Sequence, residues 1–187
     1  MVRPDFKSGW GCQQPRVGST PILFRHDMDD ALNVTFPTDR LYAAEQDMWV
    51  LLEGDGRVRV GATHWVAAHG QFMYFSPRPV GTTVERDRSM GVMETAKTLV
   101  SIHAPISGRI VEVNEAVVGD VAPIERDPYG EGWMFRLEPS NLEAERPLLL
   151  DAGSYVRWLE PRAQEKAQQR PIEGFDTDFT IDPNRGY

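Results

Sequence analysis

The chain has 187 residues, of which 41% are hydrophobic, and this supports one domain with a modest core plus terminal extensions. Its net charge of −8 argues against nucleic acid as a partner, because phosphates demand a basic face. The sequence has a single cysteine, no apolar run of membrane-spanning length and no signal-peptide pattern, so we expect a cytoplasmic protein without an intramolecular disulfide or a membrane anchor.

Three segments follow one another along the chain. Residues 1–35 are predicted to form an N-terminal extension punctuated by glycine and proline. Residues 36–160 are predicted to form one domain of short strands separated by frequent turns. Residues 161–187 are predicted to form a polar tail that is again punctuated by proline. The middle segment therefore holds the candidate functional residues.

A short helix is the first clear element of the middle segment. The stretch THWVAAHG predicts a helix over 63–69, with Thr63 as its N-cap and Gly70 as its stop. Upstream and downstream of this helix, apolar runs are short and are interrupted by turn residues. This pattern is typical of a mainly β domain.

The next elements form a hairpin, a strand and a second helix. The ranges 92–94 and 99–102 predict two strands around a small polar turn at 95–98. Residues 109–113 alternate polar and apolar side chains, which predicts a half-buried strand. The range 142–160 predicts a C-terminal helix with an apolar stripe.

Lys97 lies in the predicted turn and is an unusual residue in this chain. The sequence has seventeen arginines and only three lysines, and the other two, Lys7 and Lys166, lie in the polar terminal segments. An amine can attack an activated acyl group and become an uncharged amide, whereas a guanidinium stays protonated and planar. Lys97 is therefore either a covalent attachment site or one more solvated surface charge, and its spacing alone leaves both readings open.

The residues around Lys97 resemble those of a lipoyl-carrying domain, and most closely the H protein of the glycine cleavage system. The resemblance spans roughly residues 36 to 160, with the motifs in the order of that family. Biotin carriers typically have methionine on both sides of the modified lysine, and Ala96 and Thr98 argue against that class. The matching motifs are Trp49-Val50, Gly61-Ala62-Thr63, Glu94, Ser101, Ala104-Pro105-Ile106-Ser107-Gly108, Val111-Glu112-Val113-Asn114-Glu115 and the stretch DPYGEGW at 127–133.

This resemblance implies a fold, a cofactor and a set of partners. The implied fold is a mainly β, lipoyl-type (barrel-sandwich hybrid) antiparallel β-sandwich with a short helix and a C-terminal helix. Lipoate would be covalently bound to Lys97 as a swinging arm, attached by a lipoate ligase or lipoyl-assembly enzymes. Glu94 would either help the attaching enzyme recognise the turn or be a solvated charge. The protein would be a carrier and not an enzyme, since the thiol–disulfide chemistry resides in the prosthetic group.

Two departures from the family pattern bear on the pathway. H proteins typically have His-Glu before the tryptophan that matches Trp49, and that glutamate helps receive the aminomethyl-loaded arm. Asp47-Met48 stands there in this chain, and Arg78 replaces acidity in a later loop. A thioether cannot pair with an amine, so we expect weak handling of an aminomethyl group, which the substitution Met48→Glu would partly restore.

These departures favour the branch of H-like lipoate-binding proteins that serves bacterial sulfur oxidation with heterodisulfide-reductase-like enzymes. That branch also has a segment like Phe75-Ser76-Pro77. The alternative is an H protein that works with the glycine cleavage enzymes. A third possibility is an unmodified H-like domain that acts only as an interaction module.

Other chemically suggestive residues carry less weight. His26, His64, His69 and His103 do not form a metal-ligand spacing with Cys12, so we expect no metal site. Cys12 itself is expected to be a passive thiol. The DPYGEGW stretch is predicted to be a turn whose glycines permit unusual backbone angles. The tryptophans of the middle segment, among them Trp49, are expected to serve packing.

Overall fold

The computed structural model describes residues 36–168, so Cys12, His26 and most of the two predicted extensions lie outside the described residues. The strands of this part of the chain form two sheets, and every strand pairing is antiparallel. The strands are β1 (Leu41–Ala43), β2 (Met48–Leu52), β3 (Val58–Ala62), β4 (Phe72–Pro77), β5 (Thr83–Val84), β6 (Ser89–Thr95), β7 (Leu99–His103), β8 (Gly108–Val113) and β9 (Phe135–Pro139). The helices are α2 (His64–Gly70), α3 (Glu115–Gly119), α4 (Ala122–Arg126), α5 (Leu142–Glu145), the 3-10 helix η1 (Arg146–Leu148) and α6 (Ala152–Gln168).

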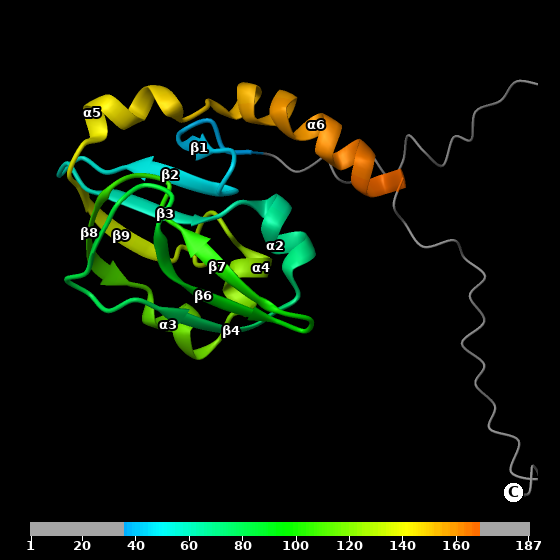
Figure 1. Cartoon of the computed structure of the whole chain (residues 1–187), viewed down its shortest axis with the longest axis horizontal. Helices are drawn as coiled ribbons and strands as arrows, with labels where there is room; N and C mark the ends of the chain where they lie inside the picture. Colours follow the sequence, from blue (N-terminus) through cyan, green and yellow to red (C-terminus); the bar gives the residue numbers. More distant parts are fainter. Residues whose placement is uncertain (1–35, 169–187) are drawn as a thin grey trace, which may run out of the picture.

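Two sheets form the body of the molecule (Figure 1). The larger sheet has the strand order β1-β2-β3-β9-β8-β5, and the smaller has the order β4-β6-β7. Their facing sides enclose the main core, in which Phe75 of β4 meets Phe135 of β9 edge to face at 5.5 Å. This arrangement is the antiparallel β-sandwich with few helices that the sequence predicted.

Period-two burial explains why β2 is apolar along most of its length. Met48 and Val50 belong to the main core between the sheets, whereas Trp49 points to the opposite side. On that opposite side a second, aromatic core forms, in which Tyr42 stacks on Tyr155 of α6 with ring centroids 4.9 Å apart. A strand buried on both faces needs apolar residues at consecutive positions.

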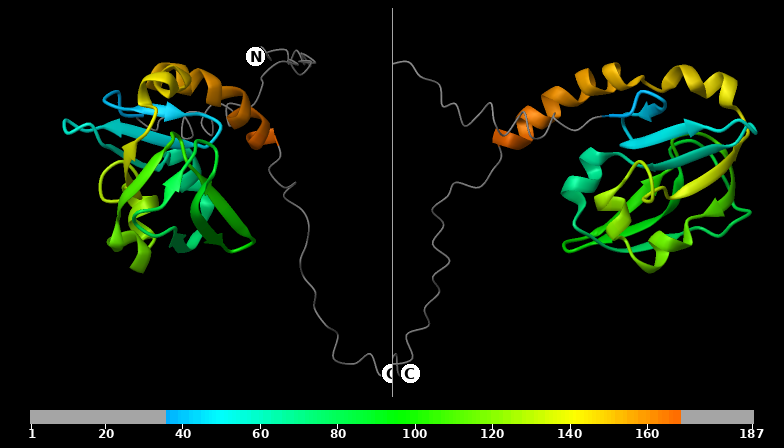
Figure 2. Two further views of the ribbon diagram at one scale, coloured as in Figure 1. Left: turned by 60° about the vertical axis from the view of Figure 1, so that its left-hand side comes forward. Right: turned by 180° about the vertical axis from the view of Figure 1, so that it is seen from behind.

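Helices α5 and α6 lie along the outer side of β1 and β2, away from the smaller sheet (Figure 2). The predicted C-terminal helix over 142–160 is therefore present but differently divided, because α5 and η1 are separated from α6 by a short extended segment. In that segment Leu150 exchanges two backbone hydrogen bonds of 2.8 Å with Tyr42.

The end predicted for this helix was wrong, because α6 continues past Pro161 to Gln168. Proline removes one backbone donor, but tertiary contacts beyond it hold the helix. Ala163 is 5% exposed, and Arg162 bonds to Asp47 of the body. The assignment of the tail to residues 161–187 therefore needs a later start, while the wider division into segments stays a prediction.

The short helix is confirmed as α2, with Thr63 as its N-cap residue. Two details of that prediction were wrong. The Thr63 side chain does not cap the helix but bonds to the hydroxyl of Tyr155 at 3.2 Å. Gly70 remains helical, and Gln71 takes the left-handed conformation with φ 46° that ends the helix.

The DPYGEGW stretch forms a turn, but the expected reason for its glycines was wrong. Gly130 and Gly132 do not have positive φ. They are required by close approach, since a Cβ at Gly130 would lie 2.2 Å from a carboxylate oxygen of Asp127. At Gly132 a Cβ would lie 2.4 Å from the carbonyl oxygen of Pro123. Asp127 organises this turn by accepting backbone N–H bonds from Gly130 and Glu131 at 3.0 and 2.9 Å.

Candidate functional site

The β6–β7 hairpin holds the candidate attachment lysine. Glu94 pairs with Leu99 across the two strands, and the chain reverses through Thr95, Ala96, Lys97 and Thr98. Both predicted strands and the turn between them are present, although β6 is longer than the predicted 92–94 and includes Thr95. Lys97 therefore stands at the tip of a tight hairpin.

Hydrogen bonds of Thr95 define the shape of this turn. Its backbone N–H donates to the Thr98 carbonyl at 2.9 Å, and its hydroxyl donates to the same oxygen at 2.9 Å. The hydroxyl oxygen also accepts the backbone N–H of Thr98 at 3.2 Å and that of Lys97 at 3.4 Å. One threonine side chain thus ties both ends of the turn together.

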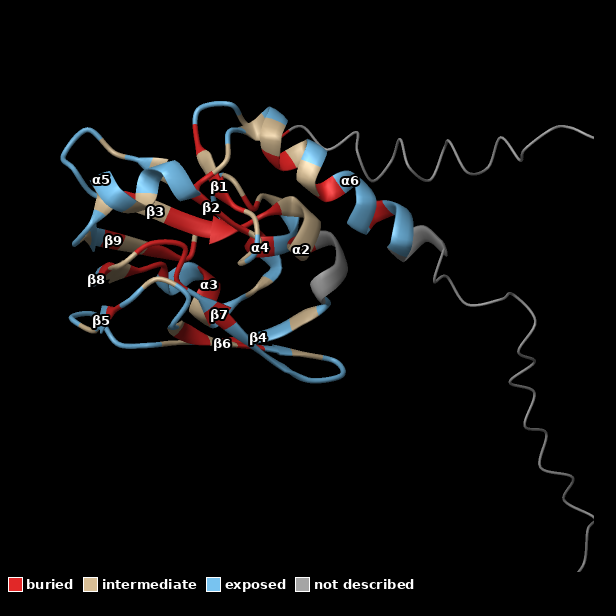
Figure 3. Ribbon diagram, turned by 45° about the horizontal axis from the view of Figure 1, so that its top comes forward, coloured by how far each residue is buried: buried red, intermediate tan, exposed pale blue. Residues whose placement is uncertain are grey.

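Lys97 itself is exposed, and the tip of the hairpin reaches beyond the buried parts of both strands (Figure 3). Among the described carboxylates none forms an ion pair with its ammonium group. The expectation of an exposed lysine on a tight turn is confirmed. An unpaired amine at this place is accessible to an enzyme that delivers an activated acyl group.

The base of the hairpin is firmly packed, in contrast to its tip. Met93 of β6 is 2% exposed and lies beside Phe75 of β4, which is fully buried. Further along β7, Ile102 is 8% exposed, and the Ser101 hydroxyl bonds to that of Ser89 at 2.8 Å. A rigid base fixes where the tip lies, so motion of an attached group would come from the arm and not from the protein.

Glu94 lies on the outer face of the smaller sheet and is exposed. It sits in register between Tyr74 of β4 and Leu99 of β7. Its carboxylate does not form an ion pair with Lys97 or with any other described cation. The geometry thus leaves Glu94 accessible to another protein, and the recognition role expected for it stays a prediction.

Met48 and Asp47 occupy the place where the family pattern has His-Glu. Met48 is 3% exposed and belongs to the main core, so its side chain does not line an open surface. Asp47 has a positive φ of 52°, and its carboxylate accepts two bonds of 3.1 Å from Arg162 and one of 3.0 Å from the Tyr155 hydroxyl. Asp47 therefore anchors α6, a role that the sequence analysis missed because Arg162 is 115 positions away.

Burial and this carboxylate raise the pKa of Tyr155 well above its ordinary value, burial being the larger cause. The hydroxyl of Tyr155 consequently stays protonated, and it donates to Asp47. The oxygen of the same hydroxyl lies 3.2 Å from the Thr63 hydroxyl. This small network ties α6 to the loop before β2 and to the start of α2.

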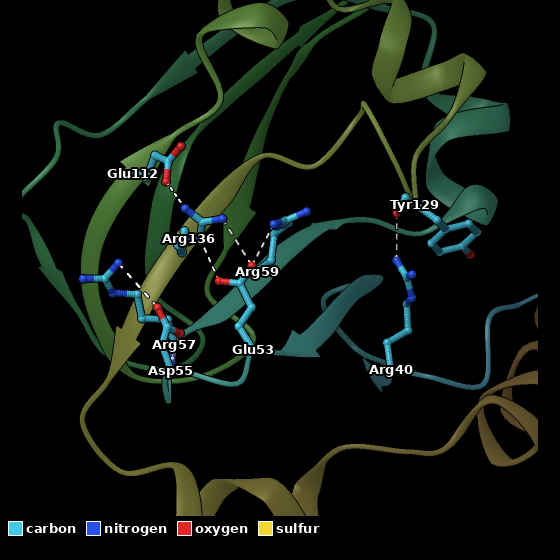
Figure 4. A network of polar contacts seen from close by, with 8 residues as sticks. All are labelled: Arg40, Glu53, Asp55, Arg57, Arg59, Glu112, Tyr129 and Arg136. Carbon is cyan, nitrogen blue, oxygen red and sulfur yellow. Dashed lines mark hydrogen bonds and ion pairs between the residues drawn. The ribbon is translucent and has the colours of Figure 1, made fainter.

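A second polar network lies on the larger sheet, in and beside its outer face (Figure 4). Glu53 forms ion pairs with Arg59 at 2.8 Å and with Arg136 at 2.7 Å, and Arg136 also pairs with Glu112. Both guanidinium groups lie over the Trp133 ring, at 5.4 and 5.7 Å from its centroid. Each acid in this network has a basic partner, so it ties strands together and offers no free acid–base pair.

Arg40 and Tyr129 form a separate contact, which Figure 4 also shows. The Arg40 guanidinium donates to the Tyr129 carbonyl at 3.0 Å and lies 4.8 Å from the Trp49 ring centroid. Trp49 is fully buried, and its indole N–H donates to the Pro128 carbonyl at 2.9 Å. Burial raises the pKa of Tyr129 to about 12, so its hydroxyl remains protonated near neutral pH. Pro128 and Tyr129 of the DPYGEGW motif thus contribute to packing. Trp49 serves packing as well, as expected.

Within residues 36–168, no cluster of three or more histidine, cysteine, aspartate or glutamate side chains has a geometry that could bind a metal ion. His103 lies on β7 and is exposed. Over the same residues, none of the helices combines the length and apolar character needed to cross a membrane.

Two antiparallel sheets that present an exposed lysine at a hairpin tip are the arrangement of a lipoyl-type carrier. The model of the family "Glycine cleavage H-protein" matches residues 40–162, and the chain belongs to this family. Members carry lipoate covalently attached to a lysine, and the exposed amine of Lys97 fits that group.

Individual relatives agree with the family model. A glycine cleavage system H protein of Thermus thermophilus is 42% identical over 128 residues, which is 68% of this chain and 98% of the relative. Glycine cleavage system H protein 5 of Aquifex aeolicus is 38% identical over 135 residues, covering 70% of this chain and 90% of that protein. The crystal structure of a glycine cleavage system H protein from Mycobacterium marinum superposes with a TM-score of 0.58 at 40% identity, covering 66% of this chain and 98% of that one.

These comparisons bear on the choice of pathway. The family model and the relatives named above are glycine cleavage H proteins, and they give no support to the lean toward sulfur oxidation in the sequence analysis. They favour what was held there as the alternative reading.

Proposed function

We propose that this chain is a lipoyl carrier of the glycine cleavage type, loaded through an amide bond at Nζ of Lys97. The observation that carries the proposal is an exposed, unpaired lysine at the tip of a firmly based hairpin in a chain of this family. When bound, the lipoyl group supplies the thiol–disulfide chemistry and carries an aminomethyl group between enzymes. The chain itself has no catalytic role in this proposal.

Each part of the chain has a defined task. The Lys97 amine attacks an activated lipoyl acyl group, forms the amide, and loses a proton as the activating group leaves. The packed base of β6 and β7 holds the attachment point still. Tethering then replaces diffusive capture by a high local concentration at whichever enzyme has docked.

The proposed partners follow from this task. A lipoate ligase or lipoyl-assembly enzymes load Lys97, and Glu94, exposed three residues before it, is one feature that they read. The glycine cleavage enzymes then use the loaded arm. The proposal places this exchange in the cytoplasm, as the single cysteine of the sequence led us to expect.

Intact mass after co-expression with a competent lipoate ligase tests the assignment. The native protein should gain one lipoyl mass, and Lys97→Arg should gain none because a guanidinium cannot form the amide. Lys7→Arg and Lys166→Arg are the matched controls and should be modified like the native protein. Modification that persists in Lys97→Arg moves the site elsewhere. A native protein that stays unmodified supports the interaction module instead.

The second candidate is a carrier of sulfur in a heterodisulfide-reductase-like pathway. The observation that favours it is Met48, which sits in the core where the family pattern has a glutamate. An exchange assay of glycine decarboxylation with purified glycine cleavage enzymes separates the two. Exchange at the rate of an ordinary H protein supports glycine cleavage. Little exchange by fully lipoylated protein supports the sulfur carrier.

A further inference from the structure

The outer face of the smaller sheet beside Lys97 carries large apolar side chains in water. Met73 is 62% exposed, Tyr74 54% and Leu99 67%, although all three lie within strands. Other apolar residues of these strands, such as Phe75 and Met93, are buried between the two sheets, whereas Val100 is 45% exposed. Exposed apolar residues that gather at one place indicate a binding surface.

Strand register brings these residues together. Tyr74 pairs with Glu94, and Glu94 pairs with Leu99, so the three side chains form one row across β4, β6 and β7. Neighbouring strands lie about 4.8 Å apart, so the row spans roughly 10 Å. The register of β4 shifts between Phe72 and Tyr74, and this irregularity leaves Met73 exposed next to the row.

Helix α3 contacts β4, and Glu125 of α4 accepts the backbone N–H of Phe72, yet Met73, Tyr74 and Leu99 stay exposed. Helices α5 and α6 lie along β1 and β2 of the other sheet (Figure 2). One end of the row, Leu99, is two positions from Lys97 on the same hairpin. The backbone position that would carry the attached group is thus two residues from one end of this row.

We propose that Met73, Tyr74 and Leu99 form a resting surface for the lipoyl group attached to Lys97. The inference rests on the proposed function, because it requires the lipoyl amide at that residue. The acyl chain is apolar and packs on Leu99 and Met73, while the ring sulfurs suit the edge of the Tyr74 aromatic ring. Because the group is tethered, even weak contacts hold it there between docking events.

This surface lowers the exposure of the lipoyl disulfide to a reductant in solution. An arm lying on the three side chains exposes less of its disulfide than an arm extended into water. A docked partner enzyme removes the arm from the surface by offering a better site. The row therefore keeps the oxidised group close to the protein until a partner takes it.

Methyl-labelled NMR of the full chain, with and without lipoylation, tests the contact directly. The methyl signals of Leu99 and Met73 should shift on lipoylation and show nuclear Overhauser effects to the arm methylenes. Val80 is the matched control, since it is 58% exposed but lies beyond the opposite end of β4. Its methyl signals should not move. Lipoylated protein in which Leu99 and Met73 respond no more than Val80 overturns the proposal and leaves the apolar row to a partner protein.

Reduction of the lipoyl disulfide by dithiothreitol gives a second readout. The rate, followed by quenching and mass spectrometry, should rise roughly threefold or more in Leu99→Ser and Tyr74→Ser, and stay unchanged in Val80→Ser. Equal rates in all four proteins contradict the proposal. Each sample is first shown by intact mass to be lipoylated, so a failure of attachment at Lys97 is recognised separately.

Discussion

Thr95 is a residue whose side chain acts on the candidate site without touching the attached group. Its hydroxyl accepts from the backbone of Lys97 and Thr98 and donates to the Thr98 carbonyl. Thr95→Val keeps the volume but removes these bonds, so the turn loosens while the base of the hairpin stays packed. We expect a loss of about 1 kcal/mol in the free energy of unfolding.

The effect on lipoylation should be larger than the effect on the fold. The KM of a lipoate ligase for Thr95→Val should rise by roughly threefold to tenfold, because the enzyme must order the turn itself. Thr95→Ser keeps the hydroxyl and should restore the native KM. A Thr95→Val protein with native lipoylation kinetics would show that the turn needs no such support.

Met48 shows why a substitution that the family pattern suggests should fail here. The sequence analysis expected Met48→Glu to restore some handling of an aminomethyl group. Met48 lies in the main core at 3% exposure, opposite Ala62 on β3, so a glutamate there would bury a carboxylate. We expect a loss of about 3 kcal/mol or more in unfolding free energy, measured by chemical denaturation. Met48→Leu keeps the apolar volume and should cost under about 1.5 kcal/mol.

At the scale of elements, the N-terminus of α6 is stabilised by hydrogen bonds to the side chain of Asp151. Asp151 precedes the helix and accepts the backbone N–H of Ser154 at 2.7 Å and its hydroxyl at 3.2 Å. These bonds hold the pKa of Asp151 below its ordinary value, and the bond from the Ser154 backbone has the larger effect. A lowered folded pKa means that the stabilisation is present above the unfolded pKa of about 3.9 and is lost as pH falls through the folded pKa.

Asp151→Asn separates the charge from the cap, since asparagine still accepts the N–H bonds but does not titrate. The native protein should unfold at a higher temperature than this variant at pH 7, and the difference should shrink as the pH falls below about 4 and through the lowered folded pKa. Thermal unfolding followed by circular dichroism across this range measures the difference. A gap between the two proteins that is the same at every pH would show that the Asp151 charge does not stabilise α6.

Two hydrophobic cores stabilise the whole molecule, and its ion pairs add unequal contributions to the free energy of unfolding. Arg136 bridges Glu53 and Glu112 across the larger sheet, with its side chain 22% exposed, and the bond that it donates to Glu53 raises its pKa. Arg109 pairs with Glu138 at 2.5 Å on the same sheet, but both side chains are more than half exposed. Solvent screens the exposed pair far more strongly than the partly buried one.

Comparison of Arg136→Ala with Arg109→Ala tests this difference by chemical denaturation. Arg136→Ala should lower the unfolding free energy by about 1–2 kcal/mol, because Glu112 loses its bond while Glu53 keeps Arg59. Arg109→Ala should leave it nearly unchanged. Equal decreases of the unfolding free energy in the two variants would mean that burial does not determine how much these ion pairs stabilise the fold.

Local pattern was sufficient for much of the fold and for the candidate lysine. Short apolar runs with turn residues predict the strands, since their side chains alternate between the core and the other face. The scarcity of lysine and the small turn at 95–98 place Lys97 at a hairpin tip, where the structure has it. These features depend on neighbours in the sequence, so the sequence reveals them.

Contacts between distant residues decided the remainder. Helix α6 passes Pro161 because Ala163 is buried and Asp47, which lies far from Pro161 in the sequence, holds Arg162. The row beside Lys97 exists because strand register aligns Tyr74, Glu94 and Leu99 across three strands. Residue pattern alone was thus enough to predict the hairpin strands, the family and the lysine at the hairpin tip. The surroundings of these features could not be read from the pattern, because burial and contacts arise when distant segments pack together.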